Sequence, residues 1–428
     1  MKVLVLGGTG FIGSAVTARL VREGHHVVAL GRRAPARQRD GIQAVRFDLA
    51  DVKRPGDWKP LLAGVDAVIN CAGALQDAPG ERLVQIHELA LDHLFAACEQ
   101  AGVRRIIHFS AAGVNRAASP FSQSKLHGDE RLMRRSLEWF ILRPSVVIGR
   151  SAYGGSALLR GLAALPVLAV PKDAGPLQLV HLDDVVQTVV ICLRPETPAR
   201  QVLELAGPTR FSFADTVQLF RTWLGWPKQR IVHLPNWAGT ILFKLGDGLR
   251  LLGWRPPVSS NARRELVYGA IGDPSTWTKV TGITPRDIQH QLEAEPASVQ
   301  ERWFAKLYFL KAAVIGVFGC FWLSTGFVSL GPGWEVGLET MRRAQVGEQA
   351  GELSVLAGGL ADLLIGAAIL YRPTSRLGLY AAILITITYA VTGTVLLPEL
   401  WREPLGPMLK VIPILVLNLV ALAVLEDR

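Results

Sequence analysis

Residues 1–150 contain short apolar runs separated by stretches with helical periodicity, one of which covers residues 81–101. The runs have the length of buried strands and cover residues 3–6, 27–30, 44–47, 67–70, 105–109 and 139–142. Strands that alternate with helices predict βαβ units and right-handed crossovers. We therefore expect an α/β fold with a doubly wound parallel sheet.

Residues 150–300 are less regular and richer in Gly and Pro, which predicts a smaller substrate lobe over the carboxyl edge of the sheet. Within it, residues 237–252 have an amphipathic helical pattern, with Trp237, Leu245 and Leu249 on the apolar side. Two interpretations fit this pattern. The helix packs on the protein's own core, or it lies on a membrane surface.

Four long apolar stretches follow, at residues 307–330, 353–371, 377–397 and 408–425. Each is near the ~20 residues that a helix needs to cross a hydrocarbon layer of ~30 Å. A buried soluble bundle would show polar helix faces, which these stretches lack. We expect two domains: residues 1–300, and an all-α four-helix transmembrane bundle over residues 305–428.

The net charge of +10 suits nucleic acid, anionic lipid or phosphorylated cofactors. No basic patch is interleaved with aromatic residues, so we expect no nucleic-acid partner. The first apolar run ends at Gly7 and is too short for a signal peptide. We expect the first domain and the C-terminus to be cytoplasmic in a multi-pass inner (plasma) membrane protein. Arg372 and Arg376, in a short loop between apolar stretches, favour this orientation.

The first strand leads into a glycine-rich turn and then a helical pattern. In such turns the first glycine makes the tight bend, the second lets backbone approach a pyrophosphate, and the third lets the helix pack on the sheet. Gly7, Gly10 and Gly13 have this spacing, and the residues expected to line the phosphates also include Thr9, Phe11 and Ile12. The helix N-terminus then presents N–H groups to the phosphates.

The second strand ends without the carboxylate that would hold a ribose 2′-hydroxyl. Arg32 and Arg33 follow instead, which favours a 2′-phosphate and hence NADP(H), with NAD(H) as the other possibility. Asp48 and Leu49 end the third strand, where an adenine amine could be met. The segment Cys71, Ala72 and Gly73 ends the fourth strand beside the cofactor, and Pro144 ends the sixth near the nicotinamide.

Six segments of the chain resemble those of extended and atypical short-chain dehydrogenases/reductases and occur in the same order. They are Gly7–Gly13, Asp48–Leu49, Asn70–Gly73, Phe109–Ser110, Arg143–Ser145 and Val180–Val185. The resemblance is closest to the group of the 39 kDa NAD(P)-binding accessory subunit of respiratory complex I and covers roughly residues 1–300. The C-terminal helices resemble a DoxX-like membrane domain by their number and position.

That family uses a Tyr-x-x-x-Lys signature. Here the aligned residues are Phe121 and Lys125. The resemblance implies that Lys125 holds the nicotinamide ribose and that Ser110 begins the family's serine region. A phenyl ring cannot transfer a proton, so three interpretations stay open. The site binds cofactor without turnover; or Lys125 handles the proton, aided by Ser122, Ser124 or His127; or the acceptor takes its proton from water.

Other polar residues have simpler explanations. His87, His93 and Glu88 lack metal-ligand spacing and are expected on a helix surface, so we predict no metal site. Asp183 and Asp184 are expected to cap a helix. The four cysteines, Cys71, Cys98, Cys192 and Cys320, are expected to be buried free thiols.

Asp362 lies mid-span, where a carboxylate must be protonated or paired. Its candidate partners are Thr386, Thr388, Tyr389 and Asn418. It is either a structural clamp or a proton or quinone site.

These features lead to two functional hypotheses. The first is a membrane-anchored oxidoreductase that transfers hydride between NADP(H) and an apolar carbonyl, enone or quinone delivered from the lipid. The second is a non-catalytic NAD(P)-binding scaffold or redox sensor with a membrane protein partner. The phenylalanine at position 121 favours the second, while the glycine loop and Lys125 are compatible with both.

Overall fold

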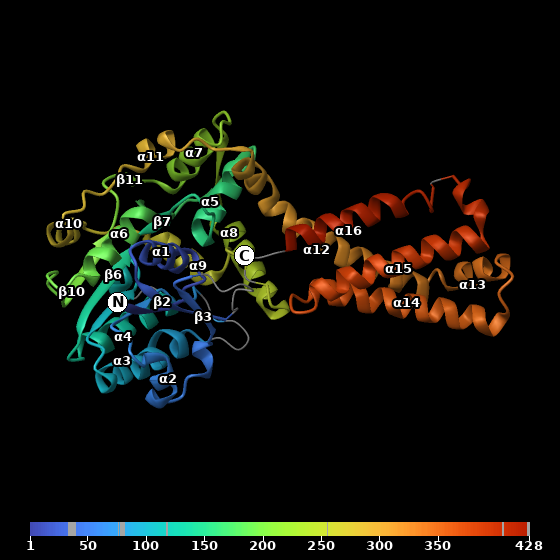
Figure 1. Cartoon of the computed structure of the whole chain (residues 1–428). Coiled ribbons are helices and arrows are strands. Elements are labelled where there is room, and N and C mark those ends of the chain that lie inside the picture. Colours follow the sequence, from blue (N-terminus) through green and yellow to red (C-terminus); the bar gives the residue numbers. More distant parts are fainter. Residues whose placement is uncertain are drawn as a thin grey trace. The chain divides into compact units, whose positions relative to one another are not determined.

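The computed structural model describes residues 1–32, 40–75, 77, 82–116, 119–254, 256–404 and 406–425. The chain folds as two compact units (Figure 1). The first comprises Met1–Gly248 and Arg255–Ala305, and the second comprises Leu249–Trp254 and Lys306–Arg428. The short segment Leu249–Trp254 thus belongs with the C-terminal helices.

A seven-stranded parallel sheet forms the centre of the first unit (Figure 1). In spatial order its strands are β10 (Gln201–Leu205), β6 (Glu138–Pro144), β5 (Arg105–Phe109), β4 (Ala67–Asn70), β1 (Lys2–Leu6), β2 (His26–Gly31) and β3 (Ile42–Arg46). The six strands expected from the apolar runs are confirmed. The edge strand β10 was not predicted, because its sequence QVLEL alternates within a region of irregular pattern.

Helices cover both faces of this sheet (Figure 1). On one face, α1 (Phe11–Arg22) and α6 (Leu182–Leu193) bury Val16, Leu20 and Val189 against the sheet. On the other, α3 (Ala90–Ala101) and α4 (Pro120–Met133) bury Leu94 and Leu132. The short helices η1 (Leu49–Asp51), η2 (Pro55–Trp58), α2 (Lys59–Leu62) and η4 (Val114–Arg116) complete this part. The doubly wound fold is therefore confirmed.

The helix expected over residues 81–101 begins differently from the prediction. Residue 81 lies outside the described residues, and a π-helical turn, η3 (Gln85–Leu89), precedes α3. This turn carries His87, which is fully buried. The expected surface positions of His87 and of Glu88, which is 8% exposed, are therefore wrong, because both side chains pack against residues of α4.

Residues 146–294 contain two small sheets and several helices. The first sheet has the strand order β11 (Arg210–Phe211), β9 (Leu177–His181) and β7 (Val146–Ile148). In the second sheet, β12 (Arg230–Leu234) pairs with β8 (Val167–Pro171). The helices are α5 (Gly154–Ala164), α7 (Phe213–Trp223), α8 (Asn236–Leu249), η5 (Arg250–Leu252), α9 (Ser260–Tyr268), α10 (Ser275–Thr281) and α11 (Ile288–Ala294). A core containing Leu168, Leu179 and Phe220 joins β8, β9 and α7.

The second unit is helical. Its elements are the greater part of α12 (Val299–Leu330), then α13 (Trp334–Arg343), α14 (Glu348–Leu370), α15 (Ser375–Leu396), η6 (Pro398–Trp401) and α16 (Val411–Leu425). Among the described residues, α12, α14 and α15 are long and apolar enough to cross a membrane. The fourth expected span, α16, has 15 residues, which is about 22 Å of helix at ~1.5 Å per residue. It therefore falls short of the predicted length.

Small residues bring these helices close together. A Cβ added to Gly366 of α14 would lie 2.8 Å from the Gly319 carbonyl oxygen of α12. In the same bundle, Asp362 is 2% exposed and accepts a 3.1 Å hydrogen bond from the Tyr389 hydroxyl. One of the partners proposed for Asp362 is thus the one observed, and the carboxylate links α14 to α15.

The cysteines are free thiols, but burial was predicted correctly for only two of them. Cys98 and Cys192 are buried, and burial raises the pKa of both thiols to about 12. Cys71 is half-buried and Cys320 is exposed. Cys320 lies on the long apolar helix α12, a candidate membrane span most of whose residues are not buried within the protein.

Candidate functional site

The turn between β1 and α1 is rich in glycine, and the packing around it leaves no room for side chains at Gly7 and Gly13. Gly7 has a φ of +68°, and a Cβ there would lie 3.0 Å from the Ala72 nitrogen. A Cβ on Gly13 would lie 2.1 Å from the Gly7 carbonyl oxygen, so only glycine allows this packing. Gly10 precedes the helix, and no side chain caps it. These features fit a diphosphate held by the first-turn N–H groups of α1.

Neighbouring residues complete this turn. Thr9 lies beside the end of β2, since its Oγ1 would be 2.5 Å from a Cβ on Gly31. Phe11 is buried and stacks on Tyr153, with ring centroids 6.0 Å apart. Ile12 packs against the sheet core from the same turn of α1.

The glycine turn lies at the point where the order of the strands in the sheet reverses, between β1 and β4. Because β1 lies between β2 and β4, the segments that follow β1 and β4 leave towards opposite faces of the sheet, and ligands of such sheets bind at this point of the carboxyl edge. Cys71, Ala72 and Gly73 leave β4 here, and Ala72 contacts the glycine turn. The structure thus brings together the glycine turn and the Cys71–Gly73 segment.

Lys125 reaches the same edge from the first half of α4. Its side chain is buried, and Nζ donates a 2.8 Å hydrogen bond to the carbonyl oxygen of Phe109 at the end of β5. A Cβ on Gly73 would lie 3.1 Å from Nζ, which places the amine directly beside the segment after β4. Burial lowers the pKa of Lys125 to about 8, although Asp129 and Cys71 partly oppose this shift.

Phe121 precedes Lys125 by one helical turn, so both face the same side of α4. Its ring packs edge-on against His87, with centroids 5.8 Å apart. His87 Nε2 accepts a 3.1 Å hydrogen bond from the Ala74 nitrogen, and Nδ1 lies 2.8 Å from the Ser124 hydroxyl. Burial and the Lys125 charge hold the pKa of His87 well below its usual value, so the ring is a neutral support.

Ser110 belongs to a buried polar network that the sequence did not reveal. Its hydroxyl donates a 2.9 Å hydrogen bond to Asp129 of α4, which also accepts two bonds of 2.9 and 3.1 Å from the Arg143 guanidinium. His108 Nε2 lies 3.3 Å from the other carboxylate oxygen. Burial raises the pKa of Asp129, but His108 and Arg143 outweigh it and lower the pKa overall.

The residues expected to set the cofactor type are placed only in part. Arg32 is exposed and follows β2, while Arg33 lies outside the described residues. Asp48 accepts a 3.0 Å hydrogen bond from the Ala50 nitrogen and caps η1, which begins at Leu49. Pro144 ends β6, and its carbonyl oxygen accepts a 2.9 Å bond from Ala112.

The expected caps of α6 are different in the structure. The side chain of His181, rather than an aspartate, accepts the hydrogen bond from the Asp183 nitrogen. Asp184 is buried and pairs with Arg286 at 2.8 Å. It therefore joins α6 to the residues before α11.

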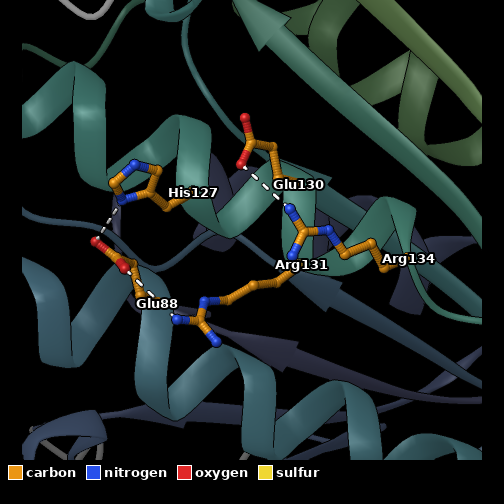
Figure 2. A pocket seen from close by; sticks show the side chains of 5 residues that line it. All are labelled: Glu88, His127, Glu130, Arg131 and Arg134. Atoms are coloured by element: carbon orange, nitrogen blue, oxygen red, sulfur yellow. Dashed lines mark hydrogen bonds and ion pairs between the residues drawn. The ribbon is translucent and has the colours of Figure 1, made fainter.

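The outer face of α4 carries a charged hollow, shown in Figure 2, of about 370 Å³. Its lining residues are Glu88, His127, Glu130, Arg131 and Arg134. His127 and Arg131 both pair with Glu88, at 3.2 and 3.8 Å. Lys125 points inward from the same helix, so the hollow is separate from the carboxyl edge. Of the proposed helpers of Lys125, His127 is thus remote from the site.

No group of three or more His, Cys, Asp or Glu side chains lies close enough to hold a metal ion among the residues that the structure describes. The buried polar groups near the carboxyl edge instead pair with each other. A dinucleotide is the ligand that the glycine turn at the carboxyl edge fits.

Two family models match the chain. An NAD(P)H-binding model matches residues 7–161, and a DoxX-like family model matches residues 319–419. The chain joins an NAD(P)-binding Rossmann domain of the short-chain dehydrogenase/epimerase type to a DoxX-like domain. The DoxX-like domain and its apolar helices indicate a membrane protein.

Curated relatives of the Rossmann domain include oxidoreductases. A 2-alkyl-3-oxoalkanoate reductase of Stenotrophomonas maltophilia is 32% identical over 174 residues, covering 35% of this chain and 52% of the reductase. A ceramide reductase of Caulobacter vibrioides is 24% identical over 312 residues, covering 67% and 97%. The chain thus spans about half the length of the first relative.

Solved structures share the fold. MoeE5, in complex with UDP-glucuronic acid and NAD, has a TM-score of 0.53 and 20% identity, covering 68% of this chain and 97% of its own. At this identity the likeness concerns the fold alone. The Rossmann domain with its smaller lobe is therefore a known arrangement.

Proposed function

We propose that this chain is a membrane-anchored oxidoreductase that transfers hydride between NADP(H) and an apolar carbonyl, enone or quinone. The observation that carries the proposal is the buried Lys125 amine beside Gly73, with a pKa lowered to about 8. An amine with this pKa can donate and recover a proton near neutral pH. It supplies the group that the phenylalanine at position 121 cannot.

We assign each site residue a role in this reaction from its position. Gly7, Gly10 and Gly13 hold the diphosphate of the dinucleotide, which when bound supplies the hydride. Lys125 is held by Phe109 and gives its proton to the substrate oxygen as the carbonyl carbon gains the hydride. Ser110 is tied to Asp129, so we assign it to positioning the end of β5.

The substrate class follows from the membrane domain and from relatives named for reductases of 2-alkyl-3-oxoalkanoates and of ceramide. The first name describes a carbonyl compound with an alkyl substituent, and the second names a lipid. A lipid with a carbonyl group could reach the site from the bilayer and be reduced by hydride and proton transfer. We place the protein in the inner membrane, with the Rossmann domain and C-terminus cytoplasmic.

A second function is favoured by Phe121 itself. Without the family's tyrosine, the domain would hold NAD(P) as a scaffold or redox sensor for a membrane complex. This is also the expectation from the resemblance to the 39 kDa accessory subunit group of complex I.

The two functions are separated by turnover. The full chain in detergent is mixed with NADPH and a panel of 3-oxoacyl lipids and quinones, and absorbance at the nicotinamide band is followed. Oxidation that disappears in Lys125→Met, while the exposed-lysine control Lys279→Met is unaffected, supports the enzyme. Tight NADPH binding without oxidation by any acceptor supports the scaffold.

A further inference from the structure

Helix α8 exposes a continuous apolar face. Its large exposed side chains are Trp237, Ile241, Leu242, Leu245 and Leu249, with exposed fractions between 45% and 69%. At about 100° per residue they occupy an arc of about 140° on one side of the helix. Leu251, in η5 directly after it, is 82% exposed. An apolar face of this extent needs a covering surface.

The opposite face of α8 is fixed to the first unit. Phe243 is buried, and a Cβ on Gly246 would lie 1.7 Å from the Val258 carbonyl oxygen. Thr240 accepts a 2.8 Å hydrogen bond from Arg263, and Asp247 bonds to Ser260. The helix therefore has one face packed on protein and one face that is largely exposed. The two interpretations of the sequence each describe one of these faces.

The segment Leu249–Trp254, which begins at the last residue of α8, belongs to the second unit and is bonded to the end of α14. The Trp254 nitrogen donates a 3.2 Å hydrogen bond to the carbonyl oxygen of Leu249, the last residue of α8. The Trp254 indole donates a 2.6 Å bond to the carbonyl oxygen of Leu370, the last residue of α14. The Arg372 nitrogen donates a 2.9 Å bond to Leu252, and its guanidinium lies 5.4 Å from the Trp254 ring.

These contacts place the segment Leu249–Trp254 at one end of the spanning helices. Leu370 and Arg372 lie where α14 ends and the chain turns towards α15, which is the boundary between hydrocarbon and headgroups for two spanning helices. Tryptophan and arginine are typical of that boundary. Since Leu249 is bonded to Trp254, the end of α8 lies at the same level. Lys244, exposed at the edge of the apolar arc, can reach lipid phosphates.

We propose that α8 is an in-plane membrane helix, with Trp237, Leu245 and Leu249 in the acyl-chain boundary of the bilayer that holds α12, α14 and α15. A helix with one strongly apolar face and a lysine at the edge of that face is suited to that position. The covering partner is thus lipid, not a second protein.

This position also connects the bilayer to the candidate site. The next helix, α9, carries Glu265, which accepts a 2.6 Å hydrogen bond from Ser122 and a second bond from Ser119 at the start of α4. Helix α4 carries Lys125. A lipid-bound α8 therefore holds the element carrying Lys125 through two bonded helices.

The test uses the full chain in nanodiscs with one chain per disc, in a Cys320→Ser background. An environment-sensitive dye is attached at Leu245→Cys or, as the control, at Arg134→Cys, where the side chain is 78% exposed on the outer face of α4. Spin-labelled lipids with nitroxides at shallow and deep acyl positions quench a dye according to its depth.

We expect blue-shifted emission at position 245, at least twofold stronger quenching by the shallow than by the deep nitroxide, and no quenching at position 134. Water-like emission at 245 overturns the proposal. Blue-shifted emission without lipid quenching also overturns it, because protein would then cover the helix. NADPH binding by both labelled proteins confirms that they are folded.

Discussion

Lys125 Nζ donates a 2.8 Å hydrogen bond to the carbonyl oxygen of Phe109, the last residue of β5. This bond holds a buried amine at the carboxyl edge of the sheet, next to the segment that follows β4. Because burial removes the amine from water, it disfavours the ammonium form and lowers the pKa of Lys125 to about 8. The amine therefore changes charge within the working pH range.

Reduction of a carbonyl should depend on this ionisation. The ammonium form donates the proton, so kcat/KM for reduction is expected to be constant below pH 8 and to fall about tenfold per pH unit above it. The reverse oxidation needs the neutral amine and should rise across the same range. Initial rates between pH 6 and 10 with NADPH and the best acceptor from the panel measure both limbs. A profile without a break near pH 8 would exclude Lys125 as the proton donor.

Phe121→Tyr should increase turnover. A tyrosine at this position would place a phenol one helical turn from Lys125, where the ammonium lowers the phenol's pKa. General acid catalysis contributes about 10²-fold to 10⁴-fold, and we expect at least a tenfold gain in kcat. NADPH affinity, measured by fluorescence titration, should stay within about twofold and serves as the control. Unchanged kcat in a variant that binds NADPH normally would contradict an active site at this position.

Asp129→Asn should destabilise the Rossmann domain. The substitution leaves the Arg143 guanidinium, 8% exposed, without its carboxylate. Breaking a buried pair typically costs about 3–5 kcal/mol. Thermal unfolding of the purified chain should show a clearly lower midpoint, while the exposed variant Glu130→Gln should not. A midpoint within one degree of the wild-type value would show that the pair of Asp129 and Arg143 contributes little to the free energy of unfolding.

The pH dependence of the same network has a defined sign. The folded-state pKa of Asp129 is lowered below its unfolded value near 3.9. The carboxylate therefore contributes stability that is complete above about pH 4 and is lost as the pH falls through the folded-state value. Wild-type protein should lose stability there, and Asp129→Asn should lose less over the same interval.

Much of the fold could be predicted from the sequence because the apolar runs are short, buried and separated by helices. Strands β4 and β5 have the predicted bounds, and the glycine turn precedes α1 as expected. Edge strand β10 could not be predicted in this way, since Glu204 divides its apolar run and the strand lies in an irregular region. The length of α16 was overestimated because hydropathy does not indicate where a helix begins.

The candidate site was predictable only where a residue acts through its position in a motif. Gly7, Gly13 and Lys125 are of this kind. The supporting residues were missed, because burial of Asp129 or His87 depends on what the neighbouring elements place around them. Asp129 lies in a polar stretch of α4 that looks solvent-facing in sequence, and Glu265 is 140 residues away from Lys125 along the chain. The one available signal was spacing: Lys125 and Asp129 are four residues apart, on one helix face.

Arg32→Ala should change the cofactor preference. The β2 strand ends at Gly31 without a carboxylate, so we expect the Arg32 guanidinium to bind a 2′-phosphate through charge-assisted hydrogen bonds. Such bonds contribute about 1.5–3 kcal/mol, so the Kd for NADPH should rise at least about tenfold while the Kd for NADH stays the same. Arg22→Ala is the matched control, because Arg22 is exposed at the far end of α1. Titration of intrinsic fluorescence gives the Kd of each dinucleotide for the wild type and for both variants. If wild-type protein binds both dinucleotides equally, the preference for NADPH is wrong. If Arg32→Ala weakens both equally, the side chain acts on the shared diphosphate instead.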